Sequence, residues 1–139
     1  MTSKTFDPVA FIGKEWSIES DNGVNPADLS GVVLKHFLKD GEDYITGDEI
    51  LERQKGEQPL NADAFLRLWE NQELIPKEWY PAAEKGYIEF SGTVLRSSYG
   101  RRVFLFLYRS DGGSWDWHYF RLDFDRDRQD VSPHSTLTP

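Results

Sequence analysis

The clearest pattern in the sequence is an alternation of apolar and polar positions in its second half. Three runs, 87–96, 101–109 and 115–124, are rich in β-branched and aromatic residues, and short segments containing Ser, Gly and Asp separate them. Connections this short join antiparallel neighbours, so the three runs predict a β-meander. The middle run is apolar on both faces from Val103 to Tyr108, which indicates that both faces of the sheet are covered there.

Helical patterns precede the meander. Thr46 stands three residues before Glu49, and this spacing is a capping box that opens a short helix. Asn61 is a typical cap for a second helix, whose apolar positions recur at helical spacing. A single helical turn is expected at 8–11, where a proline follows an aspartate.

Two further segments, 15–19 and 31–38, alternate like strands. The patterns together predict one α+β domain over 6–124, in which two short helices and extended N-terminal segments pack on a C-terminal antiparallel meander of at least three strands. Residues 1–5 are expected to be flexible, and so is the tail 125–139, because it contains few apolar residues. The predicted core consists of Phe11, Trp16, Ile50, Leu51, Phe65, Leu68, Trp69, Trp79, Ile88, Phe90, Val94, Val103, Leu105, Leu107, Phe120 and Leu122.

Composition narrows the classes of protein that fit. The chain has 139 residues, with 24 acidic and 16 basic side chains, a net charge of −8 and no cysteine. Its longest apolar run is far shorter than a membrane span, so we expect no membrane association and a cytoplasmic location. The negative charge disfavours duplex DNA as a partner and favours a basic protein.

Four segments resemble a family of small uncharacterised bacterial proteins. They are the stretches FIGKEWSI (11–18), GEDYITGDEIL (41–51), LWENQELIPKEW (68–79) and GTVLRSSYGRRVFLFLY (92–108). The resemblance implies a bacterial, single-domain protein, and it carries no activity or catalytic residue over to this chain.

Two groups of side chains suggest chemistry. Asp116 and His118 share a strand face, which is the arrangement a small hydrolytic enzyme would need to orient an imidazole. Asp123, Asp125 and Asp127 resemble the start of a calcium loop, but arginines interrupt them and the required Gly and Glu are missing. The sequence leaves open whether this run binds any cation.

No catalytic residue, metal site or cofactor is assigned. The chain contains neither of the glycine-rich phosphate-binding motifs, and its glycine pairs are explained by hairpin turns. His36 lies in an apolar strand pattern and is expected to be a core histidine, whereas His134 in the tail is uninformative.

The most promising surface is one face of the run 115–124, because its rings and cationic edges form a stacking platform. The sequence leaves open whether this face is exposed or covered by the N-terminal segment. The residues predicted to bind are Trp115, Trp117, Tyr119, Arg121, Arg109 and Tyr108. The residues of the opposite face, expected to be the main core contact, are His118, Phe120, Leu122 and Phe124.

We therefore predict a non-enzymatic binding or protein-interaction module that engages another protein through the aromatic strand face. One alternative is a small hydrolase that uses Asp116 and His118. A second is a binder of single-stranded nucleic acid or carbohydrate through Trp115, Trp117 and Tyr119. The oligomeric state is left open.

Overall fold

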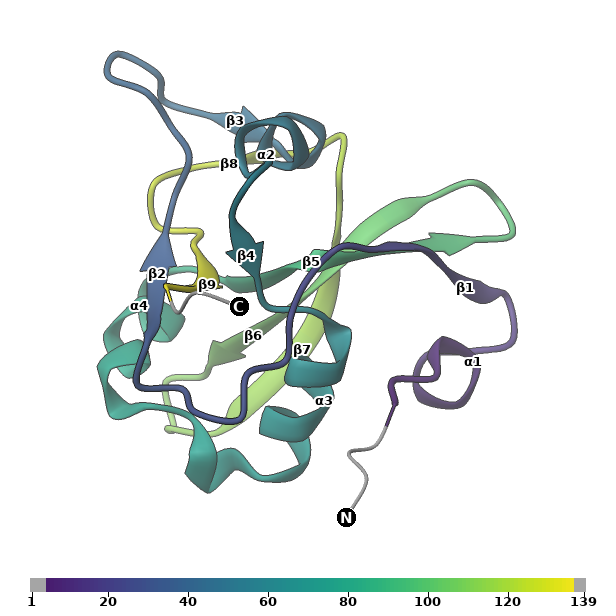
Figure 1. Cartoon of the computed structure of the whole chain (residues 1–139), viewed down its shortest axis with the longest axis horizontal. Helices are drawn as coiled ribbons and strands as arrows, with labels where there is room; N and C mark the ends of the chain where they lie inside the picture. The colour runs from purple at the N-terminus through teal and green to yellow at the C-terminus, as the bar shows by residue number, and fades with distance from the viewer. Residues whose placement is uncertain (1–4, 137–139) are drawn as a thin grey trace.

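The computed structural model describes residues 5–136 and confirms the α+β fold (Figure 1). The helices are α1 (Pro8–Phe11), α2 (Gly47–Arg53), α3 (Ala62–Glu70) and α4 (Tyr80–Lys85), with two 3-10 turns, η1 (Gln72–Leu74) and η2 (Lys77–Trp79). The strands are β1 (Trp16–Asp21), β2 (Val32–Lys35), β3 (Ile45–Thr46), β4 (Gln58–Pro59), β5 (Ile88–Ser97), β6 (Arg102–Arg109), β7 (Trp115–Arg121), β8 (Asp125–Arg126) and β9 (Ser132–Ser135).

The main sheet has four strands in the order β1-β5-β6-β7, and all neighbours are antiparallel. The predicted meander is therefore confirmed, and β1 is added along β5 so that Trp16 lies opposite Ser97. Helices α3 and α4 pack against β6. Both predicted helix caps are present, because Thr46 Oγ1 accepts from Glu49 N–H (3.2 Å) and Asn61 Oδ1 from Ala64 N–H (3.1 Å).

A second sheet has three strands in the order β2-β9-β4, and β3 and β8 form a separate two-stranded pair. The C-terminal segment therefore supplies β8 and the central strand of the small sheet (Figure 1). The expected flexible tail is wrong for 125–136, because backbone pairing with β2, β3 and β4 holds a segment that has few apolar side chains. The rest of that tail, 137–139, and residues 1–4 of the predicted N-terminal tail lie outside the described residues.

Two groups of buried apolar residues form the core, the larger one between the main sheet and α3 and the smaller one around Phe104 and Leu122. Most of the predicted core is buried, but Phe120 is only half-buried and lies outside both groups. The histidine prediction is also wrong, since His36 is exposed and His134 has an exposed fraction of 1%. Predicted core residues that are only partly buried against these groups are Phe11, Leu51 and Trp69.

Two glycines allow the main sheet and the small sheet to meet. A Cβ at Gly92 would lie 2.7 Å from Gly23 Cα and 2.8 Å from the carbonyl oxygens of Pro59 and Leu60. The same crossing carries hydrogen bonds, because Gly92 N–H donates to Leu60 O (3.0 Å) and Asn22 N–H donates to Gly92 O (2.8 Å). Side chains are therefore excluded where the two sheets are joined.

Gly92→Ala should lower the free energy of unfolding by about 1–3 kcal/mol, because the added methyl group meets backbone atoms that cannot rotate away. Urea unfolding measures the effect. Gly112→Ala is the matched control, since no atom lies within 4 Å of its added Cβ. Equal stability of the two variants would contradict the close approach.

Candidate functional site

The predicted aromatic face of β7 lies against the body of the protein. Trp117 packs on Phe11 of α1 with ring centroids 4.7 Å apart, and Tyr119 packs on Trp16 of β1 at 4.9 Å. Trp115 contacts Tyr80 of α4 at 5.4 Å, and all three residues are half-buried. The N-terminal segment therefore covers this face, which is continuous with the larger core group.

The predicted cationic edge is also engaged within the protein. Arg109 Nη1 pairs with Glu84 at 2.8 Å, and its guanidinium lies 4.3 Å from the centre of the Tyr80 ring. Arg121 pairs with Asp123 at 2.8 Å. Tyr108, another of the residues predicted to bind, lies on the other face of the sheet, because it is the neighbour in sequence of the core residue Leu107.

That other face carries a group of aromatic rings that we call the second-face cluster. The ring of Tyr87 stacks on Phe106 at a centroid distance of 3.8 Å, and both contact Phe120 in edge-to-face geometry. The expectation that this face is the main core contact is wrong for positions 118, 120 and 124, which are exposed or half-buried. The members of the cluster are Tyr87, Phe106, Tyr108, His118, Phe120 and Phe124.

Cations already lie over one end of this cluster. The guanidinium of Arg126 lies 4.2 Å from the centre of the Phe120 ring, and that of Arg121 lies 4.8 Å from the centre of Phe124. Ring faces attract cations through their quadrupole, so these contacts are stabilising. At this end of the cluster, Arg121 and Arg126 of the protein itself therefore already contact the ring faces.

The opposite end has a carboxylate and no cation. Tyr108 Oη donates to Asp116 Oδ2 at 3.3 Å, and partial burial together with this carboxylate raises the pKa of the Tyr108 hydroxyl. Asp116 is exposed, and it forms no ion pair with any of the residues 5–136. Tyr87, Tyr108, His118 and Asp116 thus combine ring faces with an unneutralised negative charge.

A buried ion pair between Arg126 and Glu89 lies next to the cluster. Arg126 donates from Nε and Nη2 to the Glu89 carboxylate at 2.9–3.1 Å, and both side chains are almost completely buried. Its Nη1 also donates to the carbonyls of Arg121 (2.6 Å) and Phe124 (2.7 Å), and Nη2 to that of Phe120 (3.2 Å). Burial raises the pKa of Glu89, and the facing guanidinium opposes that rise.

Asp116 and His118 each contact a backbone group of β7. Asp116 Oδ1 accepts from Trp117 N–H at 2.8 Å, and His118 Nδ1 lies 3.0 Å from Tyr119 O. Both side chains therefore cap backbone groups on the outer edge of β7 instead of meeting each other. This arrangement protects an edge strand from pairing with another chain, and it gives no support to a hydrolase.

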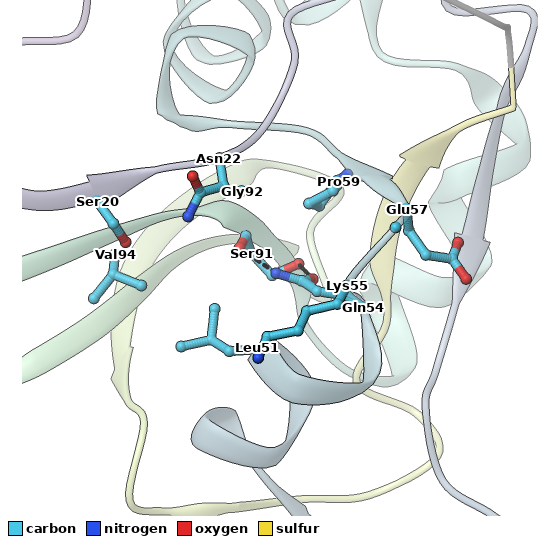
Figure 2. Close-up of a pocket in the computed structure, with 11 residues that line it drawn as sticks. Ser20, Asn22, Leu51, Gln54, Lys55, Glu57, Pro59, Ser91, Gly92 and Val94 are labelled. Carbon is cyan, nitrogen blue, oxygen red and sulfur yellow. Dashed lines mark hydrogen bonds between the residues drawn. The ribbon is translucent and has the colours of Figure 1, made fainter.

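A polar pocket lies between α2, β4 and the crossing of β1 and β5 (Figure 2). Its volume is about 300 Å³. The buried Gln54 side chain donates from Nε2 to Ser91 O (2.9 Å) and accepts at Oε1 from Ser91 Oγ (2.7 Å), as the dashed lines in Figure 2 show. The buried amide is thus already satisfied, and none of the described residues that line the pocket has a buried side-chain polar atom without a hydrogen-bond partner.

The acidic run after β7 is occupied by contacts of its own. Asp123 pairs with Arg121, and Asp127 Oδ1 accepts from Gln129 N–H at 2.9 Å. Within the part of the chain that the structure describes, no three His, Asp or Glu side chains are placed to hold a metal ion. No helix among the described residues is long and apolar enough to cross a membrane.

Comparison with family models, curated proteins and solved structures finds no match to this chain. The resemblance to small bacterial proteins therefore stays a prediction.

Sequence reasoning missed Tyr87 and Phe106 as members of the second-face cluster. The pairing of β6 with β7 could have indicated the cluster, because it places Phe106 opposite His118 and Phe104 opposite Phe120. Directly opposite side chains on one face lie close together, so a paired row of rings could have been predicted there.

Proposed function

We propose that the protein is a non-enzymatic interaction module that binds a basic segment of another protein through the second-face cluster. The observation that carries this proposal is the exposed carboxylate of Asp116, which accepts from Tyr108 Oη at the end of the cluster where the described residues supply no cation. An arginine or lysine of a partner would contact both the ring faces and the carboxylate.

The other end of the cluster supports this choice of ligand. There, Arg121 and Arg126 already lie over Phe124 and Phe120, so the same face stabilises guanidinium groups within the protein. Aromatic residues are also enriched at protein interfaces, where they contribute much of the binding energy. The net charge of −8 favours encounter with a basic partner.

Binding to a basic segment can be tested with two short amidated peptides, Gly-Arg-Pro-Arg and Gly-Glu-Pro-Glu, added to the isotope-labelled protein. We expect the arginine peptide to shift the amide signals of β6 and β7, and the glutamate peptide to leave them in place. The double variant Asp116→Asn/His118→Ala should bind the arginine peptide at least tenfold more weakly, because it removes the exposed carboxylate and an exposed ring of the same strand face.

The matched control is Tyr44→Ala/Tyr99→Ala, which removes two exposed rings elsewhere, with exposed fractions of 64% and 83%. This control should bind like the unmodified protein. Equal responses to the two peptides, or equal losses in the two double variants, would show that the second-face cluster is not the binding surface.

The same variants identify a natural partner. Immobilised protein is exposed to lysate with and without nuclease treatment, and captured proteins are compared by mass spectrometry between the unmodified chain and the two double variants. A protein lost only with Asp116→Asn/His118→Ala is the expected result. Capture that depends on nucleic acid would instead favour a nucleic-acid binder.

A further inference from the structure

A groove follows the outer edge of β2, on the side of the molecule occupied by the small sheet. Its volume is about 640 Å³, and most of its lining is apolar, including Leu29, Pro76 and the buried Trp79. The consecutive residues Val32, Val33 and Leu34 all contribute to the lining. Side chains of consecutive strand residues point to opposite faces, so the groove lies along the edge of β2 and not on one of its faces.

Along this edge, Leu34 presents unpaired backbone groups, whereas the N–H of Val32 already donates to Leu29 O at 3.1 Å. Strand β2 has a neighbour only in β9, and Leu34 lies opposite Pro133 in that ladder. Pro133 has no N–H, and its carbonyl accepts from Leu60 N–H, so Leu34 and Pro133 exchange no hydrogen bonds. The N–H and C=O of Leu34 therefore point away from β9, where the structure places no other strand among residues 5–136.

An adjoining hollow near the start of β2 holds a guanidinium without a counter-ion. The hollow has a volume of about 410 Å³, shares Leu29 and Ser30 with the groove and is also lined by Arg67. Arg67 Nη2 donates to Pro26 O at 2.7 Å, while its buried Nε has no hydrogen-bond partner in the described part of the chain.

No carboxylate neutralises this guanidinium within residues 5–136. Asp28, which also lines the hollow, accepts from Ser30 N–H at 2.9 Å instead. Burial lowers the pKa of Arg67, and no neighbouring negative charge offsets this effect. The groove thus ends in a positive charge that the protein leaves uncompensated.

We propose that β2 binds the C-terminal end of a partner protein as an added antiparallel strand, with the terminal carboxylate on Arg67. An antiparallel guest runs toward the start of β2, so its C-terminus reaches the hollow beside Leu29 and Ser30. Its backbone pairs with Leu34, and its apolar side chains enter the groove. This site is separate from the second-face cluster and does not depend on it.

The test uses two pools of fluorescein-labelled hexapeptides with Val, Ile, Leu, Thr or Phe at the last four positions. One pool has a free C-terminal carboxylate and the other an amidated end, and fluorescence anisotropy measures the binding of each. We expect the free-acid pool to bind about tenfold to hundredfold more tightly, as a charge-assisted hydrogen bond provides.

Arg67→Gln should reduce binding of the free-acid pool to the level of the amidated pool and leave the amidated pool unchanged. Arg101→Gln is the matched control, because it removes the charge of an exposed arginine outside the groove, and it should have no effect. Equal binding of both pools, or no binding tighter than about 1 mM, would overturn the proposal.

Hydrogen exchange gives an independent readout that does not need a variant. Leu34 N–H should exchange rapidly in the free protein and slowly with the free-acid pool, whereas Val33 and Lys35, which face β9, should be protected in both states. Protection of Leu34 that rises with protein concentration alone would show that a second copy occupies the edge, and the proposal would fail.

Discussion

Replacing Arg126 by methionine is expected to lower the free energy of unfolding by about 3–5 kcal/mol, because the change leaves the buried Glu89 carboxylate without its counter-ion. The carbonyls of Phe120, Arg121 and Phe124 also lose their donor. Methionine keeps the apolar stem of the side chain, so the loss comes mainly from the guanidinium and its contacts. Urea unfolding at neutral pH gives the value.

Arg102→Met is the matched control for this experiment. Arg102 also joins two carboxylates, Glu19 and Asp48, but its side chain has an exposed fraction of 35%, so water screens the pairs. Its loss should change stability by no more than about 1 kcal/mol. If Arg126→Met proved as stable as Arg102→Met, the buried pair would not be holding the turn after β7.

A double-mutant cycle separates the ion pair from the carbonyl contacts. Glu89→Leu/Arg126→Met removes both charges and should recover part of the loss seen in Arg126→Met, because no unpaired charge then remains buried. Full recovery is not expected, since the carbonyls of Phe120, Arg121 and Phe124 still lack their hydrogen bonds from the guanidinium.

Acidification from pH 6.5 to pH 4 should lower the free energy of unfolding by about 3 kcal/mol through His134 alone. Burial lowers the pKa of His134 from its ordinary value of 6.5 to about 4, Lys35 acts in the same direction and Glu57 opposes it. Both ring nitrogens lack a hydrogen-bond partner among residues 5–136, and Glu57 Oε1 lies 3.8 Å from Nδ1, so burial keeps the folded imidazole neutral above about pH 4.

The direction of this change in stability depends on whether the folded or the unfolded chain binds the proton at the higher pH. Below pH 6.5 the unfolded chain takes up a proton on His134 while the folded chain does not, so falling pH favours unfolding until the folded group also titrates near pH 4. Glu42 has its pKa lowered to about 2 by Arg53 and by the Lys39 N–H, so it acts in a more acidic window.

His134→Gln tests this assignment by urea unfolding between pH 7 and pH 4. The variant should lose less stability over this range than the unmodified protein, and the difference should approach about 3 kcal/mol. His36→Gln is the control, because it removes an exposed imidazole from the segment that follows β2, and its profile should follow that of the unmodified protein. If all three proteins lost the same stability between pH 7 and pH 4, groups other than His134 would cause the acid sensitivity.

The parts of the fold that could be predicted from sequence are those in which local pattern and tertiary structure agree. The caps at Thr46 and Asn61 are formed by hydrogen bonds over three residues, and the meander follows from strands joined by short turns. Ile88, Val103 and Leu107 are buried as their alternation indicates. None of these features requires knowledge of distant segments.

The errors arise where burial is decided by a distant segment. The apolar residues at 120, 122 and 124 predict that the His118 face of β7 packs on the core. In the structure α1 packs on the opposite face, at Trp117, and His118 is exposed. Strand β9 has the sequence Ser-Pro-His-Ser, which carries no strand pattern, and is ordered by two neighbours that lie far away in the chain. The buried charge of Arg126 depends likewise on Glu89 and could not be read from the acidic run around it.

The position of β9 between β2 and β4 also restricts the order in which the protein can fold. During synthesis β2 and β4 emerge well before β9, and neither is paired with the other, so the small sheet cannot begin until its middle strand has left the ribosome. Contacts between segments so distant in sequence form slowly, because the entropy of closing a long loop must first be overcome. Until then the apolar edge of β2 is open on both sides, and the nascent chain is most exposed to aggregation and to chaperones at this stage.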